Sequence, residues 1–313
     1  MSGVNHRLIE RVVRQALARC LADSGRPVNE PSAFPGELFV SPEVRGIKEE
    51  IVRVGKKLWA REYVDGNGGN ISCRVSPHYV VCTPTLCSKA DIREEDLSLV
   101  TLDNHRVIGE REHTSEIRLH LEIYKAVPAA RAVVHCHPPH ATAYAITGQV
   151  PPGEIVPEVE VFVGPVALAP YETPGTTAFA ETILPYVRRH NTMLLANHGI
   201  VCWADTVTHA EWYVEVVETY CRTILLASML GKPLKKIPKK KVAELLKIKQ
   251  TLGLADARLP VQKEAAKFQA QTSVEAPEEM SAPQGSRAVD EEKFDALVAG
   301  ITEQVIGFLN QRS

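Results

Sequence analysis

Apolar residues follow a helical spacing in several long stretches of the chain and gather into short runs between them. Spacing of three and four residues predicts helices that bury one face, over 43–61, 207–231 and 242–252. Short apolar runs bounded by glycine, proline or polar residues predict strands, at 71–75, 79–83, 132–134 and 193–196. We further expect a helix after Ser115, a helix followed by a loop over 141–155, a β-like segment at 157–168 and a helix over 177–190.

Both ends of the chain carry amphipathic stretches that stand apart from this pattern. Residues 1–22 and 291–313 each place apolar side chains at helical spacing on one side. The segments next to them, 23–41 and 259–290, have the polar, proline-containing composition of linkers. We therefore expect one main domain over 42–258 with a tethered helix at each end. Such a helix cannot bury its apolar face alone, so it needs a partner.

Composition narrows the class of protein. The chain has 313 residues, 44% of them hydrophobic, and 36 basic against 38 acidic residues give a net charge of -2. This balance offers no electrostatic case for nucleic acid. There is no apolar run of about 18 residues that would cross a membrane and no secretory pattern at the N-terminus. Seven cysteines without paired C-x-x-C spacing predict free thiols and a cytoplasmic protein.

Two histidines two residues apart end one of the predicted strands. His135 and His137 follow the apolar run 132–134, and two prolines then stop the strand. Residues two apart point to the same face of a strand, so both imidazoles can reach one metal ion. His198 ends the short apolar run 193–196 in the same way. A catalytic zinc needs three protein ligands and an open position, and these three histidines are the candidates.

Two further stretches are open to more than one interpretation. The turn 65–70 is rich in glycine, which lets backbone N–H groups approach an anion, but a simple turn between helix and strand would look the same. Glu116 would lie in the first turn of a helix capped by Thr114 or Ser115. There it is either a capping acid stabilised by the helix dipole or a carboxylate that moves a proton beside the metal.

Four motifs occur in a fixed order and at characteristic distances: Gly68-Gly69-Asn70-Ile71-Ser72, Thr114-Ser115-Glu116, His135-Cys136-His137 and Asn197-His198-Gly199. Glu116 precedes His135 by 19 residues, and His198 follows His137 by 61. In these motifs and gaps the chain resembles the class II aldolase/adducin family, most of all its L-fuculose-1-phosphate aldolases. The resemblance covers roughly residues 42–255.

The resemblance implies a fold, a metal centre and a reaction. The fold would be an α/β/α sandwich of three layers with a largely antiparallel sheet, in a homotetramer with sites at subunit interfaces. One zinc ion per subunit would sit on His135, His137 and His198, with Glu116 as acid/base. The family's phosphate-binding residues map onto Asn67, Gly69, Asn70, Thr85, Thr114 and Ser115. The implied reaction cleaves L-fuculose or L-rhamnulose 1-phosphate to dihydroxyacetone phosphate and lactaldehyde.

The chain also departs from that pattern. The two tyrosines of the fuculose enzymes are missing near 156–160 and near Leu252. Leu86 replaces a glycine and Asn67 replaces a threonine of the phosphate site. A sugar-phosphate epimerase or a metal-dependent decarboxylase of the same family is therefore an alternative. A non-catalytic, adducin-like interaction protein is a second alternative, although such members lack the metal histidines that this chain has.

The tethered terminal helices resemble the encapsulation peptides of bacterial microcompartment cargo. A protein shell would confine a reactive aldehyde product, and the shell proteins would bind through 1–22, 291–313 or both. The alternative is that these helices only mediate contacts within the oligomer. If deleting one of these segments stops the protein from co-purifying with shell proteins, that segment is the one that binds the shell.

Overall fold

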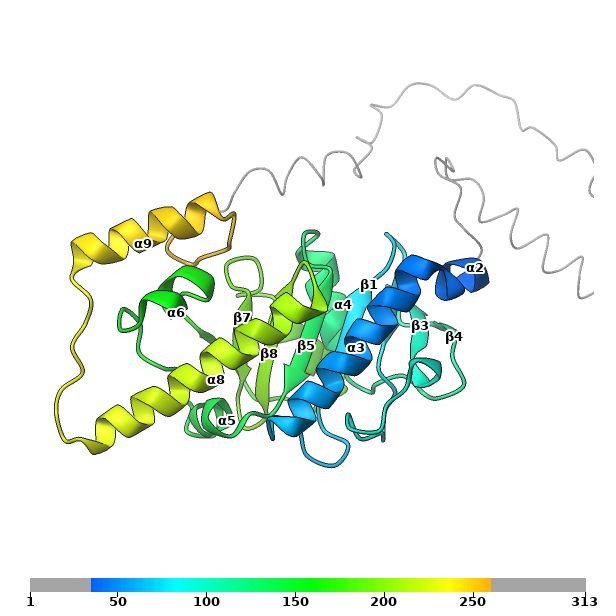
Figure 1. The fold of residues 1–313 in the computed structure, drawn as a ribbon, viewed down its shortest axis with the longest axis horizontal. Coiled ribbons are helices and arrows are strands. Elements are labelled where there is room, and N and C mark those ends of the chain that lie inside the picture. Colours follow the sequence, from blue (N-terminus) through cyan, green and yellow to red (C-terminus); the bar gives the residue numbers. More distant parts are fainter. Residues whose placement is uncertain (1–34, 260–313) are drawn as a thin grey trace, which may run out of the picture. The chain divides into compact units, whose positions relative to one another are not determined.

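A computed structural model describes residues 35–259, which contain one mixed sheet between layers of helices (Figure 1). The predicted helices at 1–22 and 291–313 lie outside the described residues. So do the linker residues 23–34 and 260–290.

The sheet has eight strands in the order β4-β3-β2-β1-β5-β8-β7-β6. Their bounds are β1 Asn70–Arg74, β2 Tyr79–Cys82, β3 Ser98–Thr101, β4 Arg106–Ile108, β5 Ala132–Cys136, β6 Ala167–Ala169, β7 Thr192–Leu195 and β8 Gly199–Ala204. Every neighbouring pair is antiparallel except β6 and β7, which are parallel. The largely antiparallel sheet that the family resemblance implied is confirmed.

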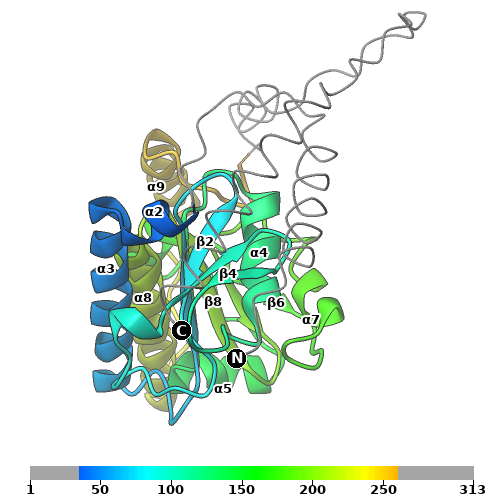
Figure 2. The same cartoon turned by 90° about the vertical axis from the view of Figure 1, so that its right-hand side faces the viewer.

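Helices cover both faces of this sheet. Their bounds are α2 Pro35–Val40, α3 Pro42–Ala60, α4 Ile117–Ala126, α5 Pro139–Ile146, α6 Pro157–Phe162, α7 Thr177–Glu181, α8 Val207–Met229 and α9 Lys239–Thr251. Figure 2 shows α3 and α8 on one side of the sheet and α4 and α7 on the other. Within residues 35–259 no helix combines the length and the apolar character needed to cross a bilayer.

Alternation along the strands gives each helical layer its own hydrophobic core. Val134 of β5 packs in the core beneath α3 and α8, and its neighbour Val133 packs in the core beneath α4 and α7. Successive side chains of a strand point to opposite faces. His135 therefore lies on the α4 side, and this places the first metal-ligand candidate beneath the N-terminus of α4.

Two predicted elements differ in the structure. The segment 157–168, expected to be β-like, is the helix α6 followed by the short strand β6. The alternating valines 159, 161 and 163 resemble a strand, but Pro157 at the first helical position and an acidic first turn favour a helix. The helix expected over 177–190 ends at Glu181 and continues as turns. Pro185 explains this, because its ring clashes with the carbonyl four residues earlier and it has no N–H.

Part of the segment predicted as a linker is helical. Residues 35–40, assigned to the linker 23–41, form α2, and the ammonium group of Lys48 on α3 donates to the carbonyl oxygen of Phe39 at 2.7 Å. Ser41 caps α3 and Pro42 occupies its first turn, so a new helix starts there and α2 and α3 do not join into one. The composition of this stretch therefore resembles a linker although it is folded.

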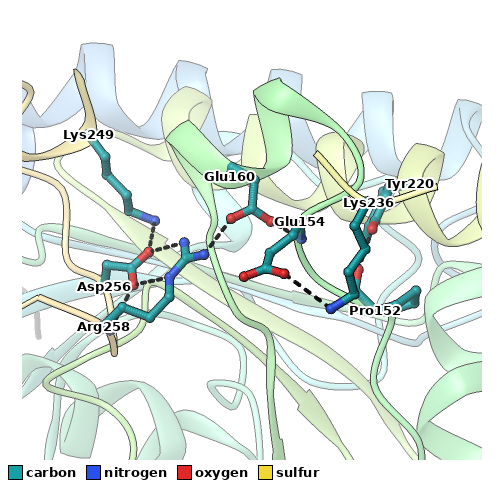
Figure 3. A network of polar contacts seen from close by, with 8 residues as sticks. All are labelled: Pro152, Glu154, Glu160, Tyr220, Lys236, Lys249, Asp256 and Arg258. Carbon is teal, nitrogen blue, oxygen red and sulfur yellow. Dashed lines mark hydrogen bonds and ion pairs between the residues drawn. The ribbon is translucent and has the colours of Figure 1, made fainter. Parts of the chain in front are cut away.

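A buried ionic network fastens the segment after α9 to α6 (Figure 3). The Arg258 guanidinium lies 2.5 Å from Glu160 Oε2 and 2.8 Å from Asp256 Oδ2, and Lys249 Nζ lies 3.1 Å from the same Asp256 oxygen. Gly164 passes against Asp256 and Lys249 with a φ of +78°, so a β-carbon there would collide with both. Glu160 is thus held by Arg258 and is part of this structural network.

We expect Arg258→Met to destabilise the protein by about 3 kcal/mol or more, because it leaves two buried carboxylates facing one cation. The Asp256 and Glu160 side chains are 0% and 1% exposed, so water cannot replace the lost charge. Urea unfolding followed by circular dichroism measures the change. Lys241→Met, which breaks the exposed pair with Glu244, is the matched control and should cost less than about 1 kcal/mol. Equal unfolding midpoints for the two variants would contradict the prediction.

Candidate active site

Three histidines from two separate strand ends meet at one point of the sheet. His135 lies in β5, His137 directly after it, and His198 in the turn between β7 and β8. One ring nitrogen from each lies within 4.8 Å of the others, and the Nε2 atoms of His135 and His137 are 3.1 Å apart. Nitrogen ligands at about 2.0–2.1 Å from a tetrahedral zinc would be separated by about 3.4 Å. The His135–His137 spacing is close to this value, and His198 completes a group of three nitrogen donors that could hold a metal ion.

The surroundings keep these imidazoles in the form that binds a metal. His135 Nδ1 bonds to the carbonyl oxygen of Ile200 at 2.9 Å, which fixes the ring and leaves Nε2 toward the other histidines. Burial lowers the pKa of His135 well below its usual value, and burial lowers the pKa of His137 to about 4. His198 Nδ1 is buried and has no hydrogen-bond partner within residues 35–259. Neutral imidazoles with a free nitrogen are what zinc requires.

A glycine lets the turn 65–70 approach this cluster. Gly69 has a φ of +70°, and a β-carbon there would lie 2.9 Å from the carbonyl oxygen of His135. Only glycine takes up this conformation without strain and without that contact. The glycine-rich turn is thus needed for close packing against β5, whichever ligand it binds.

Glu116 points at the histidines. Its Oε2 lies 3.3 Å from Nε2 of His135, and its Oε1 lies 3.4 Å from Nε2 of His198. It occupies the N-cap position of α4 without making a side-chain capping bond. The interpretation of Glu116 as a capping acid is therefore not supported. Its carboxylate faces the three candidate metal ligands instead.

Beneath Glu116 lies a row of buried polar side chains: Asn70, Ser72, His120 and Tyr124. Sequence reasoning assigned Asn70 to the phosphate site and missed the other three. Asn70 and Ser72 are alternate residues of β1, and Glu116, His120 and Tyr124 recur every four residues on α4. Both spacings place the side chains on one face. The signal was present in the sequence as polar residues in positions that the apolar pattern assigns to the core.

The residues expected to bind phosphate lie on three neighbouring segments. Asn67 and Ser115 are exposed, Thr85 is half-buried, and Gly69, Asn70 and Thr114 are buried. The N–H group of Thr114 donates to the carbonyl oxygen of Thr83 at 3.0 Å, which joins two of the segments. The amide of Asn70 is engaged with Glu116 and His120. Within residues 35–259 no hydrogen bond joins any two of the five side chains in this set, Gly69 having none.

The loop 83–89 keeps a conformation that favours glycine although it carries a leucine. Leu86 has a φ of +50° and is 77% exposed. Near it Lys89, which sequence reasoning also missed, is buried and donates to the carbonyl oxygens of Cys87 at 2.9 Å and Asn67 at 3.5 Å. Its ammonium group therefore bridges the loop 83–89 and the glycine-rich turn.

Comparison with known proteins agrees with this geometry. The family model "Class II Aldolase and Adducin N-terminal domain" matches residues 49–225. A 5-deoxy-D-ribulose 1-phosphate aldolase of Bacillus thuringiensis is 32% identical over 202 residues, which cover 64% of this chain and 93% of that protein. A 3-oxo-tetronate 4-phosphate decarboxylase of Escherichia coli is 27% identical over 205 residues, which cover 64% and 95%.

A solved structure of an L-fuculose 1-phosphate aldolase matches with a TM-score of 0.61 and 27% identity, over 69% of this chain and 98% of that one. The family model spans more than half of the 313 residues. The chain therefore belongs to the class II aldolase and adducin family and is an enzyme of the class II aldolase type.

Proposed function

We propose that this enzyme is a zinc-dependent aldolase that cleaves L-fuculose or L-rhamnulose 1-phosphate to dihydroxyacetone phosphate and lactaldehyde. The observation that carries the proposal is the position of the Glu116 carboxylate, within 3.4 Å of two of the three candidate metal ligands. A carboxylate at this place can move a proton next to a site of developing negative charge.

The reaction divides between the metal and the residues of the chain. His135, His137 and His198 would hold the zinc ion, whose charge, when bound, stabilises negative charge on the substrate oxygens. Cleavage breaks the C3–C4 bond, leaves its electron pair on the ketone fragment, and moves a proton from the C4 hydroxyl group to C3. Glu116 is the group within reach that can carry this proton. The turn 65–70 and the loop 83–89 would hold the phosphate and orient the ketone fragment.

A decarboxylase acting on a phosphorylated 3-oxo acid is the second candidate. Loss of carbon dioxide also leaves an electron pair next to a carbonyl group, but it needs no acid or base at an aldehyde oxygen. The chain lacks both tyrosines of the fuculose enzymes, and one of its relatives is a 3-oxo-tetronate 4-phosphate decarboxylase.

Assays of the full chain separate these reactions. L-fuculose 1-phosphate, L-rhamnulose 1-phosphate and 3-oxo-tetronate 4-phosphate would each be tested with zinc and after chelation. Coupled reduction of dihydroxyacetone phosphate reports cleavage of the two sugar phosphates. Loss of carbon dioxide from 3-oxo-tetronate 4-phosphate gives dihydroxyacetone phosphate as well, so decarboxylation is followed by carbon dioxide release. Chelator-sensitive cleavage of either sugar phosphate supports the aldolase. Carbon dioxide release without cleavage would overturn it in favour of the decarboxylase.

The assembly and the terminal segments belong to the same proposal. We propose a homotetramer and, through 1–22 or 291–313, association with a microcompartment shell. Light scattering of the full chain gives the number of subunits. Co-expression of shell proteins with chains that lack either segment gives the targeting role. Undiminished co-purification after both deletions would contradict it.

We expect Lys89→Met to raise KM for the phosphorylated substrate about tenfold, because a buried ammonium group joins the two segments that would hold the phosphate. Burial lowers the pKa of Lys89 to about 8, so its charge is present below that pH and lost above it. KM of the parent enzyme should therefore rise as the pH passes about 8, and KM of Lys89→Met should not. Lys56→Met, on the exposed side of α3, is the control. The same KM profile in parent and Lys89→Met would contradict the prediction.

A further inference from the structure

A buried chain of hydrogen bonds runs from Tyr124 to Glu116. The Tyr124 hydroxyl group lies 2.8 Å from Ser72 Oγ, which lies 2.7 Å from Nδ1 of His120. His120 Nε2 lies 2.6 Å from Oδ1 of Asn70, and Nδ2 of Asn70 lies 2.8 Å from Oε2 of Glu116. The four residues behind Glu116 are at most 5% exposed, so water does not compete for these bonds.

The geometry of β1 and α4 explains why the chain of bonds is continuous. Four residues of a helix advance about 6 Å, and two residues of a strand advance about 6.6 Å. Positions 116, 120 and 124 along α4 therefore have nearly the same spacing as positions 70 and 72 along β1. Each strand residue lies between two helix residues, and each of the inner side chains has a partner on both sides.

The chemistry of the groups fixes the direction of every bond. An amide that gives its N–H to the carboxylate turns its oxygen, which can only accept, toward His120. Nε2 of His120 must then carry the proton. Burial lowers the pKa of His120 to about 3, so the ring is neutral and its Nδ1 accepts from Ser72. With its only proton given to His120, Ser72 accepts from Tyr124. All donors point toward Glu116.

We propose that His120 is a positioning residue, which acts through Asn70 to hold the Glu116 carboxylate against His135 and His198. The inference rests on the proposed role of Glu116. The chain of bonds is a support and not a proton relay, because the Asn70 amide neither gives up nor takes a proton under these conditions. It fixes Oε2 and leaves Oε1 for the proton that is moved in the reaction.

Two substitutions of His120 test whether a donor at the position of its Nε2 supports Asn70. A glutamine places its amide near the position of Nε2, so His120→Gln keeps a donor for Asn70. Asparagine is shorter and places its amide near Nδ1, so His120→Asn loses that donor. We expect His120→Gln to stay within about threefold of the parent and His120→Asn to lose about 10- to 100-fold in kcat. KM and zinc content should stay within twofold in both.

A double-mutant cycle shows whether His120 acts through Asn70. In an Asn70→Ala background, His120→Asn should cause no further loss of kcat, because the link to Glu116 is already broken. Independent, additive losses would overturn the proposal, and so would equal losses for His120→Gln and His120→Asn. If His120→Asn fails to fold, Ser72→Ala serves instead, with an expected loss of about three- to tenfold in kcat and no change in KM.

Neutron diffraction of the full chain tests the bond directions without any substrate. Deuterium should occupy Nε2 of His120 and be absent from Nδ1; the opposite tautomer would overturn the proposal. If the parent enzyme acts on none of the three substrates, the proposed function fails, and the tautomer still decides whether the support exists as described.

Discussion

Replacing His135 with alanine is expected to remove the metal and to lower kcat/KM by about 10³-fold or more. A bound divalent cation contributes several kcal/mol of charge stabilisation in this type of reaction, and each 1.4 kcal/mol is a factor of about ten in rate. The three imidazole rings are nearly equally spaced, at 4.9 Å between His135 and His137, 4.6 Å between His135 and His198 and 5.0 Å between His137 and His198, so the loss of one of them should open the whole site. Elemental analysis of the purified variant measures the metal, and the cleavage assay measures the rate.

His209→Ala is the matched control for this experiment. His209 lies on the exposed surface of α8, where it pairs with Asp205, so its loss should leave metal content and rate unchanged. Treatment of the parent enzyme with a chelator should reproduce the loss of activity seen in His135→Ala, and added zinc should restore only the chelated parent. Full zinc content in His135→Ala would show that the three histidines do not form the metal site.

The metal-ligand candidates could be predicted from the sequence because their positions depend on local rules. Two prolines after His137 end the strand, and the alternation of strand side chains places His135 and His137 together. The third candidate ligand, His198, followed from the same pattern. Glu116 could be located on its helix, but whether it caps the helix or faces the metal depends on how α4 packs against β1 and β5. No local sequence pattern predicts that packing.

The remaining differences arise where neighbouring segments override a local preference. The alternating valines of α6 suggest a strand, yet α6 lies beside the network around Arg258 and Asp256, contributed by residues almost 100 positions later. Strand β8, Gly199–Ala204, was not predicted from the sequence, and it pairs with both β5 and β7. The hydrogen bonds of Asn70 and Ser72 could not be predicted because their partners lie on α4, and sequence spacing alone does not pair two elements.

We expect Glu116→Gln to lower kcat by about 10²- to 10⁴-fold while KM and zinc content change little. Glutamine has nearly the shape of glutamate, and its amide oxygen can accept the hydrogen bond from Asn70 that holds the carboxylate at 2.8 Å. An amide does not carry a proton at neutral pH, and general acid–base catalysis contributes this much. The variant thus removes proton transfer and leaves the metal site, which distinguishes it from His135→Ala.

Glu122→Gln tests whether a change on α4 alone has this effect. Glu122 lies on the same helix and pairs with Lys125 at 3.0 Å at the surface. The kcat of Glu122→Gln should therefore match that of the parent enzyme. If proton transfer by Glu116 limits the rate, Glu116→Gln should lower kcat less for a substrate whose reaction does not need this proton transfer than for the sugar phosphates. A Glu116→Gln enzyme with a kcat within threefold of the parent would contradict the assignment of Glu116 as acid/base. It would direct the search to another proton carrier around His198.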